Sequence, residues 1–261
     1  MPHISFRKGK LAYTDKGKGR VLILLHGFLG NKELWSYHAS VLSKKYRVIT
    51  IDLPGHGKSD ELGYIQTMEL FAEALHELIS HLKIRKLVLI GHSLGAYVAL
   101  AFAEKFPDAI LGLIMMNSTA KGDSDARKKS RDQLVRLVKK DRNKALEMLV
   151  PNFFNVKSRS MHWKVKRYLK AAKMCSSKAI VATIEGMKIR KEREIILHFS
   201  PFPYLYFIGE FDAVFPPADL IEESQLNAKG GYIYFERSSH MIYLEEDARS
   251  IKKIRQFIAK L

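Results

Sequence analysis

Short runs of apolar residues alternate along the chain with stretches whose apolar positions recur at helical spacing. Runs such as Val21–Leu25 and Leu87–Ile90 have no polar face, which is typical of parallel strands covered on both sides. Further strands are predicted at Ile4–Phe6, Lys10–Thr14, Arg47–Ile51, Leu111–Met116, Tyr204–Ile208 and Tyr232–Phe235. The first two of these alternate and indicate an antiparallel hairpin at the start of the chain. The whole pattern predicts an α/β fold with a mostly parallel, doubly wound sheet of about eight strands.

Helical periodicity predicts five helices around this sheet. They are Lys32–Lys44, Thr67–Leu82, Leu94–Lys105, Asp219–Asn227 and Glu246–Lys260. Pro107 follows the third helix closely and is a stop signal. Thr67 is followed three residues later by Leu70 instead of the Glu or Gln of a capping box, so the start of that helix is weakly marked.

A long segment between two predicted strands contains no strand pattern. It indicates amphipathic helices at Ser124–Leu149, Ser158–Cys175 and Lys178–Glu194, with Pro151 separating the first two. Because ordinary connections in α/β units have about 2–6 residues, we interpret this segment as an inserted helical cap. The predicted organisation is a core in two parts, residues 1–118 and 201–261, interrupted by a cap at residues 119–200, here called the cap segment.

The formal net charge of +17 is concentrated in the cap segment, which holds 22 Lys and Arg against 8 Asp and Glu. Such an excess can attract nucleic acid, an anionic membrane surface or an anionic ligand. However, no nucleic-acid-binding motif accompanies the charge, and stacking aromatic residues are not interleaved with it. We therefore favour a solvated basic surface and expect no nucleic-acid partner; contact with a membrane surface is the weaker alternative.

The chain ends and the cysteine count bear on location. The N-terminal sequence MPHISFRKGK lacks the apolar stretch of a signal peptide, and no run is long enough to predict a membrane-spanning helix. The single cysteine, Cys175, excludes an internal disulfide and is expected to serve packing. These features favour a cytoplasmic protein, and they set no expectation for the oligomeric state.

The most informative motif is Gly91–Gly95, whose sequence GHSLG fits the pattern G-x-S-x-G. It comes directly after a predicted buried strand and opens a predicted helix. A serine on such a tight turn stands above the strand ends, next to the free N–H groups of the helix N-terminus. The motif therefore predicts Ser93 as a nucleophile and the backbone N–H of Leu94 as one donor of an oxyanion hole.

Together with two earlier loops, this motif resembles the α/β-hydrolase family. The loops are His26–Gly30, with the sequence HGFLG, and Asp52–Ser59, with the sequence DLPGHGKS, and they occur in the family's order. The resemblance covers the chain outside the cap segment. It implies that the backbone N–H of Phe28 is the second oxyanion donor and that His26 orients its loop. It also implies a scaffolding role for Asp52; we expect His92 to be structural because the residue before the serine points away from substrate.

A serine hydroxyl needs a base and an acid that orients the base, and in this fold they follow the serine in the order acid, histidine. His162 falls in the cap segment, and His198 precedes a strand and should lie at the opposite sheet edge. His240 follows the last predicted strand, which favours it as the base. The family's G-x-x-D position corresponds to Gly209–Asp212 and implies Asp212 as the acid.

Glu210 is the alternative acid. Some relatives place the acid after the preceding strand, but that strand ends here in Asn117, which carries no charge.

The predicted function is hydrolysis of a carboxylic ester, through an acyl-enzyme on Ser93, with a small to medium, partly apolar substrate and no metal or organic cofactor. Relatives that open epoxides or displace halide use an aspartate where this chain has Ser93. The expected pocket lining is Phe28, Tyr97, Met115, Phe153, Phe154, Met161, Trp163, Val214 and Met241.

Three alternatives stay open. A lyase similar to that of the menaquinone pathway, or a carbon–carbon hydrolase, would use the same triad on an anionic substrate. Such lyases tend to carry an arginine where this chain has Tyr97. A non-catalytic ligand-binding receptor is the alternative from another class.

Overall fold

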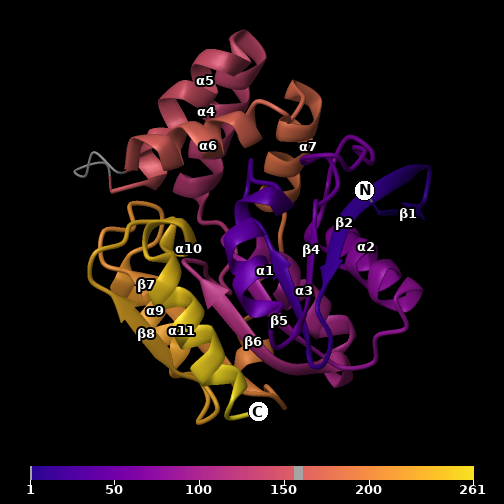
Figure 1. Cartoon of the computed structure of the whole chain (residues 1–261). Helices are drawn as coiled ribbons and strands as arrows, with labels where there is room; N and C mark the ends of the chain where they lie inside the picture. The colour runs from indigo at the N-terminus through magenta and orange to yellow at the C-terminus, as the bar shows by residue number, and fades with distance from the viewer. Residues whose placement is uncertain (1, 156–160) are drawn as a thin grey trace.

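The computed structural model describes residues 2–155 and 161–261 and contains one mixed eight-stranded sheet (Figure 1). The strand order is β1-β2-β4-β3-β5-β6-β7-β8. The strands are β1 (His3–Phe6), β2 (Gly9–Lys16), β3 (Val21–Leu25), β4 (Arg47–Ile51), β5 (Leu87–His92), β6 (Ile110–Met116), β7 (Tyr204–Gly209) and β8 (Tyr232–Phe235). Pairing is antiparallel for β1–β2 and β2–β4 and parallel for the rest. The predicted fold class, including the entry hairpin, is confirmed.

Helices cover both faces of the sheet, and nearly all residues of the central strands are therefore buried. On one face α1 (Ser36–Leu42) packs against α11 (Asp247–Ile258), and on the other α2 (Met68–His81) packs against α3 (Leu94–Lys105). Two further helices of the core, α9 (Pro217–Ser224) and the short α10 (Ile242–Glu245), pack against β7. Every residue of β5 is buried, as expected for a strand with helices on both sides.

Local chemistry explains where the core helices begin. The expected helix over residues 32–44 is two elements, the short 3-10 helix η1 (Lys32–Trp35) and then α1. The Asn31 side chain accepts a hydrogen bond from the Glu33 N–H and caps η1. The Thr67 hydroxyl accepts from the Leu70 N–H at 3.1 Å, so Thr67 caps α2 although its sequence lacks the capping box.

Between β6 and β7 the described residues form helices and no strand. The elements are α4 (Asp125–Lys140), α5 (Arg142–Leu149), the 3-10 helix η3 (Val150–Phe153), α6 (Met161–Ala172), α7 (Ser177–Lys188) and α8 (Glu194–His198). Figure 1 shows α4, α5 and α6 gathered at the top of the view, beyond the sheet. The start of the expected helix at 158–175 lies outside the described residues.

Two of the expected helices in this segment end earlier than predicted. The expected helix 124–149 breaks at Asp141, whose φ of −154° is extended and whose carboxylate accepts from the Lys144 N–H at 3.0 Å. Asp141 therefore ends α4 and caps α5. Its side chain bonds to the backbone instead of extending the helix, and amphipathic periodicity does not reveal this. The expected helix 178–194 likewise ends at Lys188, and α8 begins only at Glu194.

Parallel pairing aligns the strand ends that carry the sequence motifs. Leu25 at the end of β3 pairs with Gly91 of β5, and Gly91 pairs with Met115 of β6. Gly209 at the end of β7 pairs with Phe235 of β8. The loops that follow β3, β5, β7 and β8 therefore emerge at the same edge of the sheet.

Candidate active site

Ser93 lies between β5 and α3 in a strained backbone conformation. Its φ is 49° and its ψ is −115°, and it precedes the first residue of α3. The Ser93 N–H donates to the Met116 carbonyl at 3.0 Å, while the Ser118 hydroxyl donates to the Ser93 carbonyl at 2.9 Å. The end of β6 and the loop that follows it thus hold the turn by two hydrogen bonds, and a turn fixed in this way keeps a non-glycine residue at positive φ.

The two glycines of the motif are required by close approach of the backbone. A Cβ atom at Gly95 would lie 2.4 Å from the Leu25 carbonyl oxygen, and one at Gly91 would lie 2.6 Å from the Ala96 nitrogen. Both contacts are with backbone atoms that cannot rotate away. The glycines therefore allow α3 to begin immediately above β3, with Ser93 at its N-terminus.

His240 and Asp212 are joined by hydrogen bonds. The distances from His240 Nδ1 to the two Asp212 carboxylate oxygens are 3.1 and 3.0 Å. The carboxylate is fully buried and also accepts from the Val214 N–H at 2.7 Å. Because a carboxylate can only accept, the imidazole Nδ1 carries the proton of this bond, which leaves Nε2 as the acceptor of the neutral ring.

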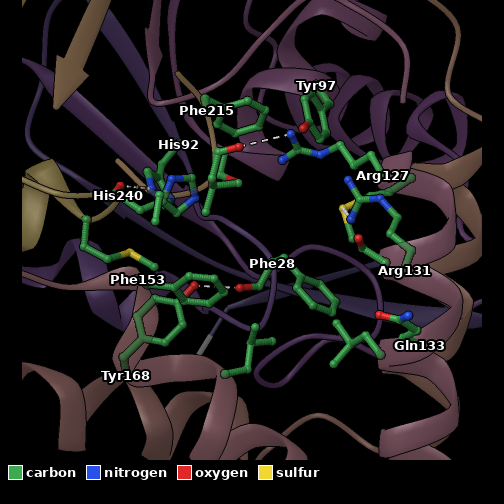
Figure 2. A pocket seen from close by; sticks show the side chains of 18 of the residues that line it. Phe28, His92, Tyr97, Arg127, Arg131, Gln133, Phe153, Tyr168, Phe215 and His240 are labelled. Atoms are coloured by element: carbon green, nitrogen blue, oxygen red, sulfur yellow. Dashed lines mark hydrogen bonds between the residues drawn. The ribbon is translucent and has the colours of Figure 1, made fainter. Parts of the chain in front are cut away.

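Ser93 and His240 border the same cavity, which has a volume of about 510 Å³. Figure 2 shows His240 in the wall of this cavity. No hydrogen bond joins the Ser93 hydroxyl to the His240 ring in the part of the chain that the structure describes. Such bonds are often long in unliganded enzymes and shorten when a substrate binds. The structure thus brings the expected base and acid into contact, with the expected nucleophile in the same cavity wall.

The other candidates for base and acid lie away from this cavity. His162 and His198 are exposed, on α6 and α8 respectively, and the alternative acid Glu210 is exposed as well. The Asp52 carboxylate is buried against Lys32, with a distance of 2.6 Å to Nζ, and accepts from the Lys58 N–H at 2.9 Å. These contacts match the scaffolding role expected for Asp52.

Two further histidines support the site without facing solvent. In His26, Nδ1 donates to the Gly27 carbonyl at 2.8 Å and Nε2 accepts from the Leu53 N–H at 3.0 Å. His92 Nε2 donates to the His240 carbonyl at 2.8 Å, and burial, reinforced by nearby His240, holds the pKa of His92 well below its usual 6.5. The His92 ring also forms part of the cavity wall, which differs from the expectation that it points away.

Of the two expected oxyanion donors, one lines the cavity and the other directly follows Ser93 in the chain. Phe28 lines the cavity, and Leu94 is the first residue of α3, whose N–H has no acceptor within its own helix. The Phe28 carbonyl accepts a 2.6 Å hydrogen bond from the hydroxyl of Tyr168 on α6. A Cβ atom at Gly27 would lie 2.5 Å from His92 Nδ1, so the loop approaches the ring more closely than any other residue type allows.

The expected pocket lining is only partly correct. Tyr97, Phe153, Val214 and Met241 line the cavity, and the Phe153 ring lies 5.5 Å from that of His240.

Four other expected residues do not line the cavity. Met115 is inside β6 with no exposed surface, and Phe154 is buried beside Tyr168. The face of α6 that meets the core carries Tyr168, so Trp163 on another face of this helix is 54% exposed. Met161, also on α6, does not line the cavity.

Sequence reasoning missed several residues of the cavity wall, above all Arg127 and Arg131 on α4. Their spacing of four residues, with Leu134 three residues further on, places all three on one helix face. The concentration of charge in the cap segment was therefore the available signal, although it was interpreted as a solvated surface. Tyr168 and Phe215 were also missed.

Within residues 2–155 and 161–261, no group of three or more His, Cys, Asp or Glu side chains is arranged to hold a metal ion. In the same residues no helix is long and apolar enough to cross a membrane. Burial raises the pKa of Cys175 to about 12, which fits the packing role expected for this residue.

Comparisons with known proteins agree with this architecture. The chain is 27% identical to the AB hydrolase superfamily protein YisY of Bacillus subtilis, over 95% of this chain and 94% of that protein. It spans about a third (31%) of an uncharacterized Mycobacterium bovis protein, at 34% identity over 107 residues.

Solved structures are similar over nearly the whole chain. A malate-bound thermophilic esterase from Thermogutta terrifontis is 28% identical, with a TM-score of 0.91 and coverage of 97% and 94% of the two chains. The enol-lactonase of Burkholderia xenovorans LB400 is 20% identical, with a TM-score of 0.91 and coverage of 99% and 100%, and supports the fold alone. A family model described as alpha/beta hydrolase fold matches residues 20–247. The chain therefore belongs to the α/β-hydrolase family, and this membership supports a hydrolase.

Proposed function

We propose that the protein is a serine hydrolase that cleaves carboxylic esters through an acyl-enzyme. The observation that carries the proposal is the hydrogen-bonded pair of Asp212 and His240 in a cavity whose wall includes Ser93. The similarity to the Thermogutta terrifontis esterase supports the same reaction class. The cavity volume of about 510 Å³ suits a small to medium substrate.

Each residue has a defined part in the proposed reaction. His240 Nε2 accepts the Ser93 proton as the hydroxyl oxygen attacks the ester carbonyl, and Asp212 stabilises the resulting imidazolium. The backbone N–H groups of Phe28 and Leu94 bind the oxyanion. His240 then protonates the leaving alcohol, and the same residue activates the water that hydrolyses the acyl-serine.

In this proposal residues 119–200 form the cap that roofs the site. They supply Phe153 beside the His240 ring and Tyr168, which holds the Phe28 carbonyl. A cap that contacts both the base and the oxyanion loop can exclude water from the acyl-enzyme and select the substrate. The core parts, residues 1–118 and 201–261, supply the reacting groups.

A fluorophosphonate probe tests the nucleophile. We expect covalent labelling of the wild type, loss of labelling in Ser93→Ala, and retention in Ser80→Ala, a matched control at an exposed serine of α2. Absence of labelling of the wild type would remove the hydrolase proposal and favour a receptor.

A p-nitrophenyl ester series of increasing chain length then tests the reaction. We expect Asp212→Asn to lower kcat by orders of magnitude, and Glu210→Gln, at the exposed neighbouring carboxylate, to leave it nearly unchanged. Equal effects of the two substitutions would contradict the assignment of Asp212.

A further inference from the structure

The cavity wall opposite the His240 side in Figure 2 carries two cations, Arg127 and Arg131. Among the described residues that line the cavity there is no Asp or Glu. The rest of the lining is largely apolar or aromatic, including Phe28 and Leu134. The cavity therefore combines an apolar passage with one positively charged region.

Among the described residues, a single carboxylate forms ion pairs with these arginines. Asp123, whose side chain is fully buried, pairs with Arg131 and with Arg190, and its distance to Arg127 Nε is 3.5 Å. Three guanidinium groups thus share a single carboxylate. Asp219 and Glu223 border a smaller hollow on another side of Arg127, but neither forms an ion pair with it. The cluster keeps an excess of positive charge.

The contacts of Arg127 and Arg131 use only some of their N–H donors. Within residues 2–155 and 161–261, the one hydrogen-bond partner of Arg131 Nη1 is the Met187 sulfur, at 3.4 Å, and a thioether is a weak acceptor. Arg127 donates one hydrogen bond to the Val214 carbonyl at 3.1 Å and stacks on the Phe215 ring at 4.3 Å. These contacts position the two cations without satisfying the five donors that each guanidinium carries.

Arg127 also occupies an unfavourable place in its helix. Ser124 caps α4 by accepting from the Arg127 N–H, so Arg127 lies in the first turn, where the helix dipole is positive. Burial, opposed in part by nearby Tyr97, lowers the pKa of the Arg127 guanidinium from its usual 12.5, although it stays charged at neutral pH. A bound anion beside Arg127 would offset both the unfavourable helix dipole and the burial of the guanidinium charge.

We propose that Arg127 and Arg131 form an anion subsite and that the natural substrate is an ester carrying a carboxylate remote from the scissile bond. The planar guanidinium fork matches a carboxylate and can bind both of its oxygens. The inference rests on the proposed function, which places the ester of the substrate at Ser93. The apolar lining of the cavity accommodates the part of the substrate between this ester and the carboxylate.

Matched pairs of esters test the subsite on the full-length protein. Monomethyl adipate and methyl hexanoate differ by a carboxylate in place of a methyl group on the acyl side, and 4-acetoxybenzoate and 4-acetoxybenzamide differ by charge on the leaving-group side. We expect wild type to show a higher kcat/KM for the anionic member of at least one pair, with the preference decreasing as salt rises. No preference in either pair overturns the subsite.

Arginine variants locate the effect. Arg127→Gln should lower the anionic-to-neutral ratio of kcat/KM by about 10-fold, the size expected for a lost charged hydrogen bond. Arg127→Lys should recover part of it. Arg136→Gln, on the exposed side of α4, makes the same change in net charge and should alter the ratio less than about 2-fold if only local contacts matter. Equal effects of Arg127→Gln and Arg136→Gln would refute a local subsite.

Binding separates this inference from the hydrolase proposal. Titration calorimetry with Ser93→Ala should show tighter binding of the anionic ester of the preferred pair, and Arg127→Gln in that background should remove the difference. Selective binding without hydrolysis by wild type would support the subsite and overturn the hydrolase. Hydrolysis of neutral esters without selective binding would support the hydrolase and overturn the subsite.

Discussion

Substitution of Gly186 by alanine tests how tightly helix α7 must approach the core. Gly186 lies near the end of α7, where a Cβ atom would be 1.8 Å from the Gln66 carbonyl oxygen and 2.4 Å from the carbonyl carbon. The Gln66 N–H also donates to the Ala182 carbonyl of α7 at 2.9 Å. The helix therefore rests directly on the backbone that leads into α2.

Two opposing effects set the magnitude. Helix propensity alone would make the alanine variant more stable by about 1 kcal/mol. Against this, the new methyl group must withdraw from 1.8 Å to about 3 Å, and only backbone atoms are available to move. Overpacking costs about 1–3 kcal/mol, and the rigid contact favours the upper end. We expect a net loss of about 2 kcal/mol.

Gly122→Ala is the matched control, because the nearest atom to its Cβ would be the Arg190 carbonyl oxygen at 3.7 Å. This substitution should be neutral or stabilising by up to about 1 kcal/mol. Urea unfolding followed by circular dichroism measures both variants, and the expected loss for Gly186→Ala corresponds to a Tm about 4–8 °C lower. The reasoning is refuted if the two variants differ by less than about 0.5 kcal/mol.

The same variant should also affect the site. Met187, the next residue, lines the cavity, and its carbonyl accepts from Arg190 Nη1 at 3.0 Å. A displacement of α7 by about 1 Å would therefore move part of the cavity wall, and displacements of this size can lower rates by about 100-fold. The esterase assay should show a larger loss for Gly186→Ala than for Gly122→Ala.

Three further substitutions probe other contacts. Tyr168→Phe leaves the Phe28 carbonyl without its 2.6 Å donor and should cost about 1–3 kcal/mol in unfolding free energy, with a lower kcat/KM for esters. Lys32→Met leaves the fully buried Asp52 carboxylate without its cation and should cost about 3–5 kcal/mol, measured by urea unfolding. For Asp123, burial alone would raise the pKa, but the adjacent guanidinium groups outweigh it and hold the pKa below 3.8. Its stabilisation is therefore complete above pH 3.8 and lost as pH falls through the lower folded-state pKa, so the instability of Asp123→Asn should diminish in acid.

Each of these predictions has a contradictory outcome. Unchanged stability and kinetics in Tyr168→Phe would mean that the loop containing Phe28 keeps its conformation without the hydrogen bond from α6. A loss below about 1 kcal/mol in Lys32→Met would mean that water reaches Asp52. A constant difference between Asp123→Asn and wild type from pH 7 to pH 3 would show that the carboxylate does not titrate with folding.

The strands and the order of the motifs were predictable because they depend on local sequence. Continuous apolar runs such as Val21–Leu25 can be buried only within a covered sheet, and parallel pairing then brings the loops that carry Ser93 and His240 to one edge. The break at Asp141 was not predictable, because an aspartate can lie on the exposed face of a continuous helix or cap the start of a new one. Nor was the inward orientation of Arg127, since tertiary packing decides which face of an amphipathic helix meets the cavity.

The positive φ of Ser93 makes this position an energetic compromise within the protein. A residue with a Cβ atom at φ 49° pays about 1–3 kcal/mol, which glycine would avoid. On stability alone glycine would be favoured at this position, and the proposed role of the Ser93 hydroxyl as nucleophile gives a reason to keep the serine. It also follows that Ser93→Ala, which keeps the conformational penalty, is a better inactive reference than Ser93→Gly, which would relax the turn and confound any comparison of ligand binding.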